Sequence, residues 1–201
     1  MQQQNVLMNN TNPGEYFPIF IYPHVKLREK VQAVTDFGPD LQKMVDKMAA
    51  TMYMASGVGL AAPQVGVSLN LFVMDVSEER NNLRVFINTE ILESSEVIPG
   101  LEGCLSFPGV IERVDRANRI VGRTQDTQGN IIPFEASEIE AIAIQHELDH
   151  LNGVLIWDKV SKLKQKYIEK TITNVMSKIP GSTAITALTT KRRGGPKRKG
   201  R

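Results

Sequence analysis

Two histidines four residues apart constrain this chain more than any other feature of its sequence. His146 and His150 enclose Glu147 in the pattern His-Glu-Leu-Asp-His. Positions i and i+4 of a helix share one face, with Cβ atoms about 5–6 Å apart, so the pattern predicts a helix that turns two imidazoles towards one metal ion. Glu147 can reach a water molecule at such an ion without binding the ion itself. The alternative is a charged helix surface on which two histidines happen to lie four residues apart.

A hydrolytic metal site needs a third protein ligand and an open position for water. No histidine follows His150, and the remaining one, His24, lies far upstream in a setting typical of a surface residue. The single cysteine, Cys104, is the other candidate, although a lone cysteine is more often a small buried apolar residue. Gly103 beside it permits a close backbone approach, and the metal-binding form of Cys104 would be the thiolate.

Two other kinds of protein use part of this pattern. A metalloprotease of the H-E-x-x-H type would take its third ligand from downstream of His150, where the sequence supplies none. A structural zinc site usually has four closed protein ligands, and no convincing fourth ligand is present. Glu147 would also have no role in a structural site.

Hydrophobic spacing predicts three helices. The first covers roughly residues 40–55, with Asp40 as its cap and an apolar face rich in methionine that we interpret as core rather than as a recognition surface. The second follows Ser137, which with Glu140 has the spacing of a capping box, and ends near Asn152 and Gly153. The third covers about residues 162–179, before Pro180.

The middle of the chain is rich in β-forming residues. The expected strands are short and cover residues 69–76, 83–88, 91–98, 110–114, 118–125 and 130–134. Short turns between them favour antiparallel pairing, and the order of helices and strands favours an α+β fold over a βαβ repeat. We therefore predict antiparallel β-sheets packed around a central helix that carries the H-E-x-x-H motif, with an N-terminal and a C-terminal helix.

A third block, residues 57–64, reads Gly-Val-Gly-Leu-Ala-Ala-Pro-Gln. Alone it is compatible with a tight turn after the first helix, and it lacks the pattern of a phosphate-binding loop. Together with Glu-Gly-Cys-Leu-Ser at 102–106 and Gln-His-Glu-Leu-Asp-His at 145–150, it resembles the three signatures of the peptide deformylase family. The resemblance covers roughly residues 18–165, without a departure at the motif positions.

The resemblance implies a hydrolase that removes the N-formyl group from the N-terminal formylmethionine of new polypeptides and releases formate. It implies that Cys104, His146 and His150 bind one divalent metal ion, natively ferrous iron, which nickel, cobalt or zinc can replace. Glu147 would act as general base and then as general acid.

Further site residues follow from the same resemblance. The side chain of Gln64 and the backbone N–H of Leu105 would bind the formyl oxygen. Gly59 and Gly103 would line the substrate groove through their backbone. Val58 and Ile142 would form the apolar pocket for the methionine side chain.

Composition and charge set the expected location and partners. The 201 residues suit one domain, no apolar run approaches the ~18 residues of a membrane span, and neither a secretory signal nor a pair of cysteines is present. We expect a cytoplasmic protein with a flexible extension at 1–15, a single catalytic domain at 16–180 and a basic, disordered tail at 181–201. The expected partners are N-formylmethionyl nascent peptides, with no DNA and no membrane.

The basic tail has two interpretations. Residues 191–201 carry seven of the 24 basic side chains and no acidic one, which leaves 17 basic against 22 acidic side chains elsewhere. The tail is either a solvated end or a segment attracted to RNA phosphate. In the peptide deformylase family the C-terminal region can dock on the ribosome beside the peptide exit. We therefore hypothesise that the C-terminal helix and the tail aid ribosome encounter.

Overall fold

The structure is a computed structural model, and it describes residues 15–179. Within this range the chain forms three α-helices and five β-strands. In chain order these are α1 (Pro39–Met54), β1 (Gly59–Ala61), β2 (Leu71–Met74), β3 (Arg84–Gly103), β4 (Ile111–Gln125), β5 (Ile131–Ser137), α2 (Glu138–Leu151) and α3 (Lys162–Met176). Short 3-10 helices occupy Val25–Arg28, Ala62–Val65 and Ile156–Lys159. The terminal segments expected to be flexible or disordered, 1–15 and 181–201, lie almost entirely outside the described residues.

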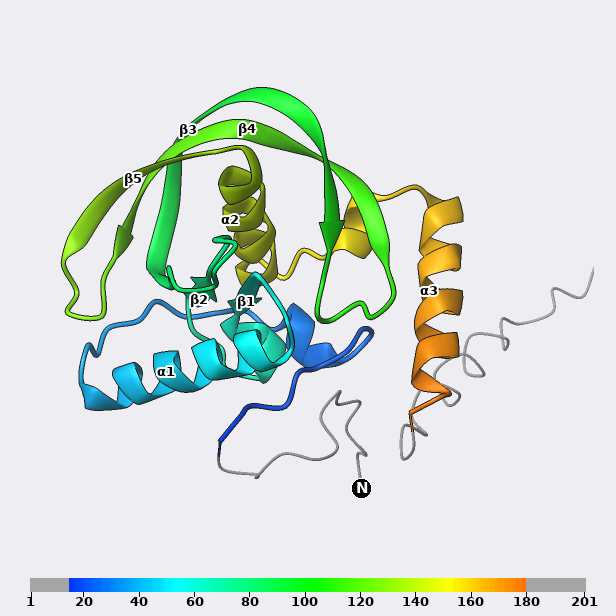
Figure 1. Cartoon of the computed structure of the whole chain (residues 1–201), viewed down its shortest axis with the longest axis horizontal. Helices are drawn as coiled ribbons and strands as arrows, with labels where there is room; N and C mark the ends of the chain where they lie inside the picture. Colours follow the sequence, from blue (N-terminus) through cyan, green and yellow to red (C-terminus); the bar gives the residue numbers. More distant parts are fainter. Residues whose placement is uncertain (1–14, 180–201) are drawn as a thin grey trace, which may run out of the picture.

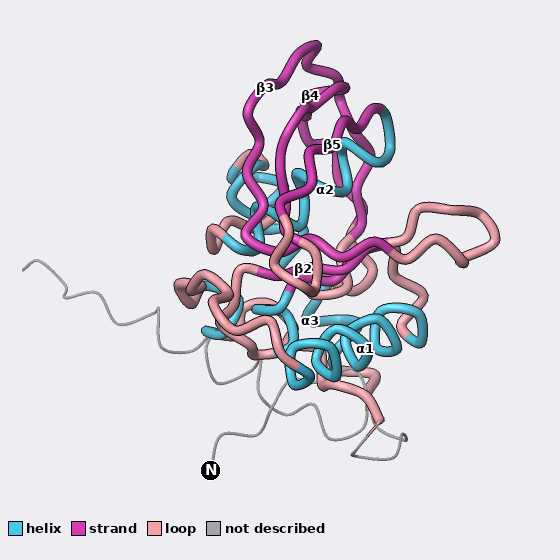
Figure 2. The backbone as a smooth tube through the Cα atoms, turned by 90° about the vertical axis from the view of Figure 1, so that its left-hand side faces the viewer, coloured by secondary structure: helices cyan, strands magenta, loops and turns pink. Residues whose placement is uncertain are grey.

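One antiparallel sheet with the strand order β1-β2-β3-β4-β5 holds all five strands. Its central hairpin of β3 and β4 bends into an arch, and α2 lies in the hollow of that arch (Figure 1). Figure 2 shows β3, β4 and β5 at one end of the molecule, with α1 and α3 at the other. The predicted α+β class is confirmed, although the strands form a single sheet rather than several.

The strands predicted as short are longer in the structure. The expected runs 83–88 and 91–98 are parts of the single strand β3, which continues through Pro99 and Gly100. Over these residues β3 is hydrogen-bonded to β4 alone, and proline is tolerated in a strand with one neighbour. Gly100 passes so close to α2 that a Cβ there would lie 3.2 Å from Ile142. β3 therefore continues through the Pro-Gly pair where it passes α2.

Two apolar clusters hold the elements together. The first contains the methionine-rich face of α1, which confirms that Met48 and Met52 belong to the core. The second lies between the sheet and α2, where the rings of Phe72 and Phe86 stack at 4.6 Å and Ile144 is fully buried. Burial of one such aromatic or aliphatic side chain contributes roughly 1.5–3 kcal/mol to the stability of the fold. The second cluster therefore holds α2 against the sheet.

The helix ends differ from two predictions. Gly38, not Asp40, is the N-cap of α1, and the Asp40 carboxylate accepts from Lys43 in the first turn. Ser137 does occupy the N-cap position of α2, but its side chain makes no capping hydrogen bond. Glu140 instead forms an ion pair with Arg84 of β3, so a tertiary contact replaces the expected capping box.

The C-terminal helix α3 ends at Met176, three residues before the expected end. Its buried residues, Ile168, Ile172 and Met176, pack on the first apolar cluster. Among residues 15–179, no helix is both long enough and apolar enough to cross a membrane.

Asp75, which follows β2, is buried and accepts four hydrogen bonds. Its carboxylate takes the hydroxyl of Tyr53 at 2.6 Å, the N–H and hydroxyl of Ser77 at 2.9 and 2.6 Å, and the N–H of Asn82 at 3.0 Å. Burial alone would raise the pKa of Asp75, but the hydrogen bonds from Ser77 and Tyr53 outweigh it and lower the pKa to about 2.

We predict that Asp75→Asn destabilises the fold by about 1–3 kcal/mol at neutral pH, because the donors lose a charged acceptor. The pKa of Asp75 is depressed in the folded state, so its contribution is complete above about pH 3.8 and declines towards about pH 2. Urea unfolding of both proteins should give a difference that is constant near neutral pH and shrinks in acid. A difference that persists unchanged at about pH 2 would contradict this account.

Candidate functional site

A cleft lies between the end of the arch, the segment that follows α1, and α2. It has a volume of about 460 Å³. Nine of the ten residues singled out from the sequence line it, which are Val58, Gly59, Gln64, Gly103, Cys104, Leu105, Ile142, His146 and Glu147. The tenth, His150, lies beside Cys104 and His146. The structure therefore brings together all ten predicted residues from three separate parts of the chain.

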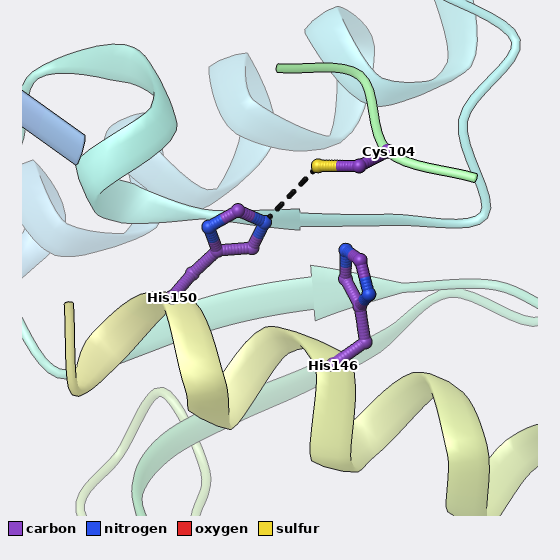
Figure 3. A group of neighbouring side chains, drawn as sticks. All are labelled: Cys104, His146 and His150. Carbon is purple, nitrogen blue, oxygen red and sulfur yellow. Dashed lines mark hydrogen bonds between the residues drawn. The ribbon is translucent and has the colours of Figure 1, made fainter. Parts of the chain in front are cut away.

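Cys104, His146 and His150 converge on one point. The two imidazoles project from the same face of α2, with ring centroids 5.0 Å apart, and Cys104 directly follows β3 on the opposite side (Figure 3). The Cys104 Sγ lies 3.2 Å from Nε2 of His150, and one ligand atom from each residue lies within 4.8 Å of the others. These are distances at which three atoms can share one ion.

A buried ion-pair network holds His146. Its Nδ1 lies 2.8 Å from Oε2 of Glu102, and the Arg116 guanidinium donates to both oxygens of that carboxylate at 2.6 and 2.9 Å. Arg116 also donates to Asp149 at 2.5 Å, one turn along α2. A proton on Nδ1, donated to the ionised Glu102, leaves Nε2 with a free lone pair, which is the form of histidine that binds metals.

Sequence reasoning did not single out Glu102 or Arg116. Glu102 could have been considered, because it is an acidic residue two positions before Cys104 in the motif Glu-Gly-Cys-Leu-Ser. No nearby sequence motif indicated a role for Arg116, since it reaches Glu102 only through the pairing of β3 with β4. Both side chains are only 4% exposed, so each charge depends on the other for compensation.

The surroundings of the two histidines shift their pKa values in opposite directions. Burial acts to lower the pKa of His146, but its contacts with Cys104 and Glu102 outweigh burial and raise that pKa well above the usual value. Burial, assisted by the charges of His146 and Arg116, lowers the pKa of His150 well below the usual value. His146 thus lies where a positive charge is stabilised, and a metal ion at its Nε2 would supply that charge, while His150 offers a neutral lone pair.

Glu147 lies at the base of the cleft and is 4% exposed. Burial raises its pKa to about 7, with a smaller contribution from the negative charge of Glu102 and an opposing one from His146. Its Oε2 is buried without a hydrogen-bond partner among the described residues. Gly59 packs directly on this carboxylate, and a Cβ at Gly59 would collide with it. A carboxylate with such a pKa can both accept and donate a proton near neutral pH.

Gln64 is held with its amide nitrogen towards the cysteine. Its Oε1 accepts from the Ala61 N–H at 2.9 Å, while Nε2 donates to the Ser106 hydroxyl at 3.1 Å and to the Cys104 sulfur at 3.6 Å. Because the oxygen is already engaged, the orientation of this amide is determined, and its nitrogen lies between Ser106 and the Cys104 sulfur.

The remaining predicted residues lie around the cleft. Val58 is at the rim and 48% exposed, whereas Ile142 is half-buried beneath the arch. Gly103 is the last residue of β3 and Leu105 follows Cys104 in the lining. Exposed apolar side chains of Leu101 and Ile139 extend the lining outward.

Comparison with known proteins agrees with this geometry. The model of the polypeptide deformylase family matches residues 16–166. A peptide deformylase of Thermodesulfovibrio yellowstonii is 45% identical over 151 residues, which cover 74% of this chain and 92% of the relative. One of Chromobacterium violaceum is 46% identical, covering 75% and 90%. The crystal structure of a peptide deformylase from Legionella pneumophila matches with a TM-score of 0.78 and 35% identity, covering 82% of this chain and 99% of that one.

The fold and the cleft together define a metal-dependent hydrolase. The chain belongs to the polypeptide deformylase family, as the match over most of its length shows. It is accordingly an enzyme that removes the N-formyl group from nascent peptides.

The donor set fits a metal of the kind this family uses. One sulfur and two imidazole nitrogens favour a transition metal over magnesium or calcium, which prefer oxygen ligands. Three protein ligands at the edge of a cleft leave a further position open to solvent and substrate, as catalytic sites require.

We predict that Glu102→Gln weakens metal binding about 10–100-fold, because the ion pair no longer fixes the proton and the ring of His146. Glu112→Gln is a matched control, since Glu112 pairs with Glu102 across the strands and is also buried, but contacts Lys164 instead of a ligand. Competition with a chelator measures both affinities without using activity. Equal affinities in the two variants would contradict the assigned role of Glu102.

Proposed function

We propose that residues 16–180 form a catalytic domain that hydrolyses the formamide bond of N-formylmethionyl nascent peptides and releases formate. The observation that carries this proposal is the convergence of Cys104, His146 and His150 beside the buried carboxylate of Glu147, at the base of one cleft. These residue types in this arrangement suit attack by water on a small carbonyl group.

Cys104, His146 and His150 would hold one divalent metal ion, ferrous iron natively, which nickel, cobalt or zinc can replace. Thiolate and imidazole suit all of these metals, and the family resemblance favours iron. When bound, such an ion supplies Lewis-acid chemistry, since it polarises a carbonyl group and makes water a stronger acid.

Glu147 would move the proton. Its carboxylate takes a proton from water as the water oxygen attacks the formyl carbon, and returns it to the amine nitrogen as the carbon–nitrogen bond breaks. The pKa of about 7 that burial gives Glu147 allows both transfers near neutral pH. The products are formate and a peptide with a free amino group.

Two donors would stabilise the formyl oxygen as negative charge develops on it. The Gln64 amide is directed towards Cys104, and the backbone N–H of Leu105 is the second donor that we assign. One donor of this kind is typically worth ~2.7–4 kcal/mol in the transition state. The hydrogen bond from the Ala61 N–H to the Gln64 side-chain oxygen keeps the amide oriented before substrate binds.

The remainder of the substrate would lie in the cleft. Gly59 and Gly103 both line it without side chains, so a peptide backbone can approach each of them closely. Val58 and Ile142 would contact the methionine side chain.

The protein would act in the cytoplasm, where formylated nascent chains emerge from ribosomes.

We predict that Glu147→Ala loses at least about 100-fold in kcat for formyl-Met-Ala-Ser, because it removes the carboxylate to which we assign both proton transfers. Formate release and metal content are measured on anaerobically prepared protein. Loss of formate release with full metal content supports the assignment, whereas equal release by both proteins would contradict it.

The control is Glu79→Ala, which removes an exposed carboxylate far from the ligands in sequence and should leave the rate unchanged.

Elemental analysis of the same anaerobic preparation should find iron. Zinc or nickel as the sole metal would contradict the assignment of iron while leaving the hydrolase assignment intact.

We also propose that α3 and the basic residues of 191–201 aid ribosome encounter through attraction to RNA phosphate. Deletion of residues 182–201 should reduce co-sedimentation with ribosomes at low salt, and replacement of the seven basic residues by glutamine should do the same. The second variant separates charge from chain length. Unchanged co-sedimentation of both variants would refute the proposal, since the attraction would then not depend on these charges.

A further inference from the structure

The loop of residues 75–83, which connects β2 to β3, lies against one wall of the cleft. That wall consists of residues 56–59 and includes Val58 and Gly59, to which the proposed function assigns substrate contacts. The loop itself does not line the cleft. Its contacts with the wall nevertheless involve two successive backbone carbonyl groups.

The loop holds these two carbonyls from behind. The backbone N–H of Asp75 donates to the carbonyl of Val58 at 2.9 Å, which prolongs the pairing of β1 with β2 by one residue. The guanidinium of Arg80 donates to the carbonyl of Gly57 at 2.6 Å. A hydrogen bond from a charged donor is stronger than one between neutral groups, and here it fixes the peptide plane that joins Gly57 to Val58.

Arg80 is itself held in position. Its guanidinium carbon lies 5.4 Å from the centre of the Tyr53 ring, and the Tyr53 hydroxyl donates to Asp75. The carboxylate of Asp75 in turn accepts from Ser77 and Asn82 on the two sides of Arg80. The loop is thus closed on Asp75, and Tyr53 connects it to α1.

The wall needs such support because its backbone packs closely on Leu105 and Glu147. A Cβ on Gly57 would lie 2.6 Å from Cδ1 of Leu105, and Gly59 packs directly on Glu147. Two glycines in four residues make the segment conformationally permissive. Ser56, where the wall begins, has a left-handed backbone with φ of 56°. A displacement of the wall would alter the width of the cleft beside Leu105 and Glu147, and bound substrate would have to restore that width.

We propose that Arg80 is a positioning residue for substrate binding, which holds residues 57–59 against Leu105 and Glu147 so that the cleft is preformed. The inference rests on the proposed function of Val58 and Gly59. Arg80 is exposed and contributes nothing to the apolar clusters, so its removal should spare the fold and loosen only the wall. The peptide would then have to order the wall as it binds, which weakens binding.

The test measures kcat and KM for formyl-Met-Ala-Ser in the metal-loaded enzyme. Arg80→Ala should raise KM about tenfold, as expected for loss of a charged hydrogen bond, and change kcat by less than about threefold. Arg80→Lys, which keeps one cationic donor, should recover part of the loss. Glu79→Ala, on the same loop, should leave both constants unchanged.

A merely structural role would reduce the amount of folded, metal-loaded enzyme, which lowers the apparent kcat but leaves KM unchanged. An unchanged KM in Arg80→Ala would therefore overturn the inference, as would a KM raised equally in Glu79→Ala. Failure of the wild-type enzyme to release formate would instead refute the proposed function, so the two failures are distinguishable.

Discussion

The ion pair between Glu102 and Arg116 is the interaction on which the arrangement of the site depends. It joins β3 to β4 and both of them to α2, because Glu102 also meets His146 and Arg116 also meets Asp149. Two charges that are 4% exposed are expensive to bury, and removal of one partner typically costs about 3–5 kcal/mol. The network is satisfied only when the arch lies over the helix in the observed register. That register places Cys104 opposite the histidines.

The rest of the cleft follows from this placement. Once the arch is docked on α2, Leu105 and Gly103 form one side and the helix forms the base. The other side is the glycine-rich segment after α1, which reaches Glu147 because neither glycine carries a side chain. Apolar packing determines how far apart these parts lie, while polar contacts orient the few groups that do chemistry. The hydrogen bond from Arg80 to the carbonyl of Gly57 is one of these polar contacts.

Much of the site could be predicted because its chemistry depends on local spacing. Two histidines and a glutamate within five residues need only a helix to converge, and α2 is that helix. The single cysteine is a candidate ligand from the sequence, because no other residue completes the set so well, and the structure places it beside the two histidines. Residues 57–64, which taken alone are compatible with a tight turn, form β1 near their centre, and β1 pairs with β2. A three-residue strand has too short a pattern to be recognised without its neighbour.

The sequence by itself indicated the hydrolase chemistry, because two histidines and a glutamate at fixed separations need only a helix to converge. The α+β class followed from the order of the helix and strand patterns, and the family followed from the resemblance of three motifs to its signatures. Only the tertiary structure revealed Glu102 and Arg116 as the support of His146, and Arg80 as the support of the cleft wall. Arg116 meets its partners across strand and helix packing, since its position is 14 from Glu102 and 33 from Asp149 in the sequence. Contacts of that kind are selected by the register of the arch on α2, which no local pattern encodes.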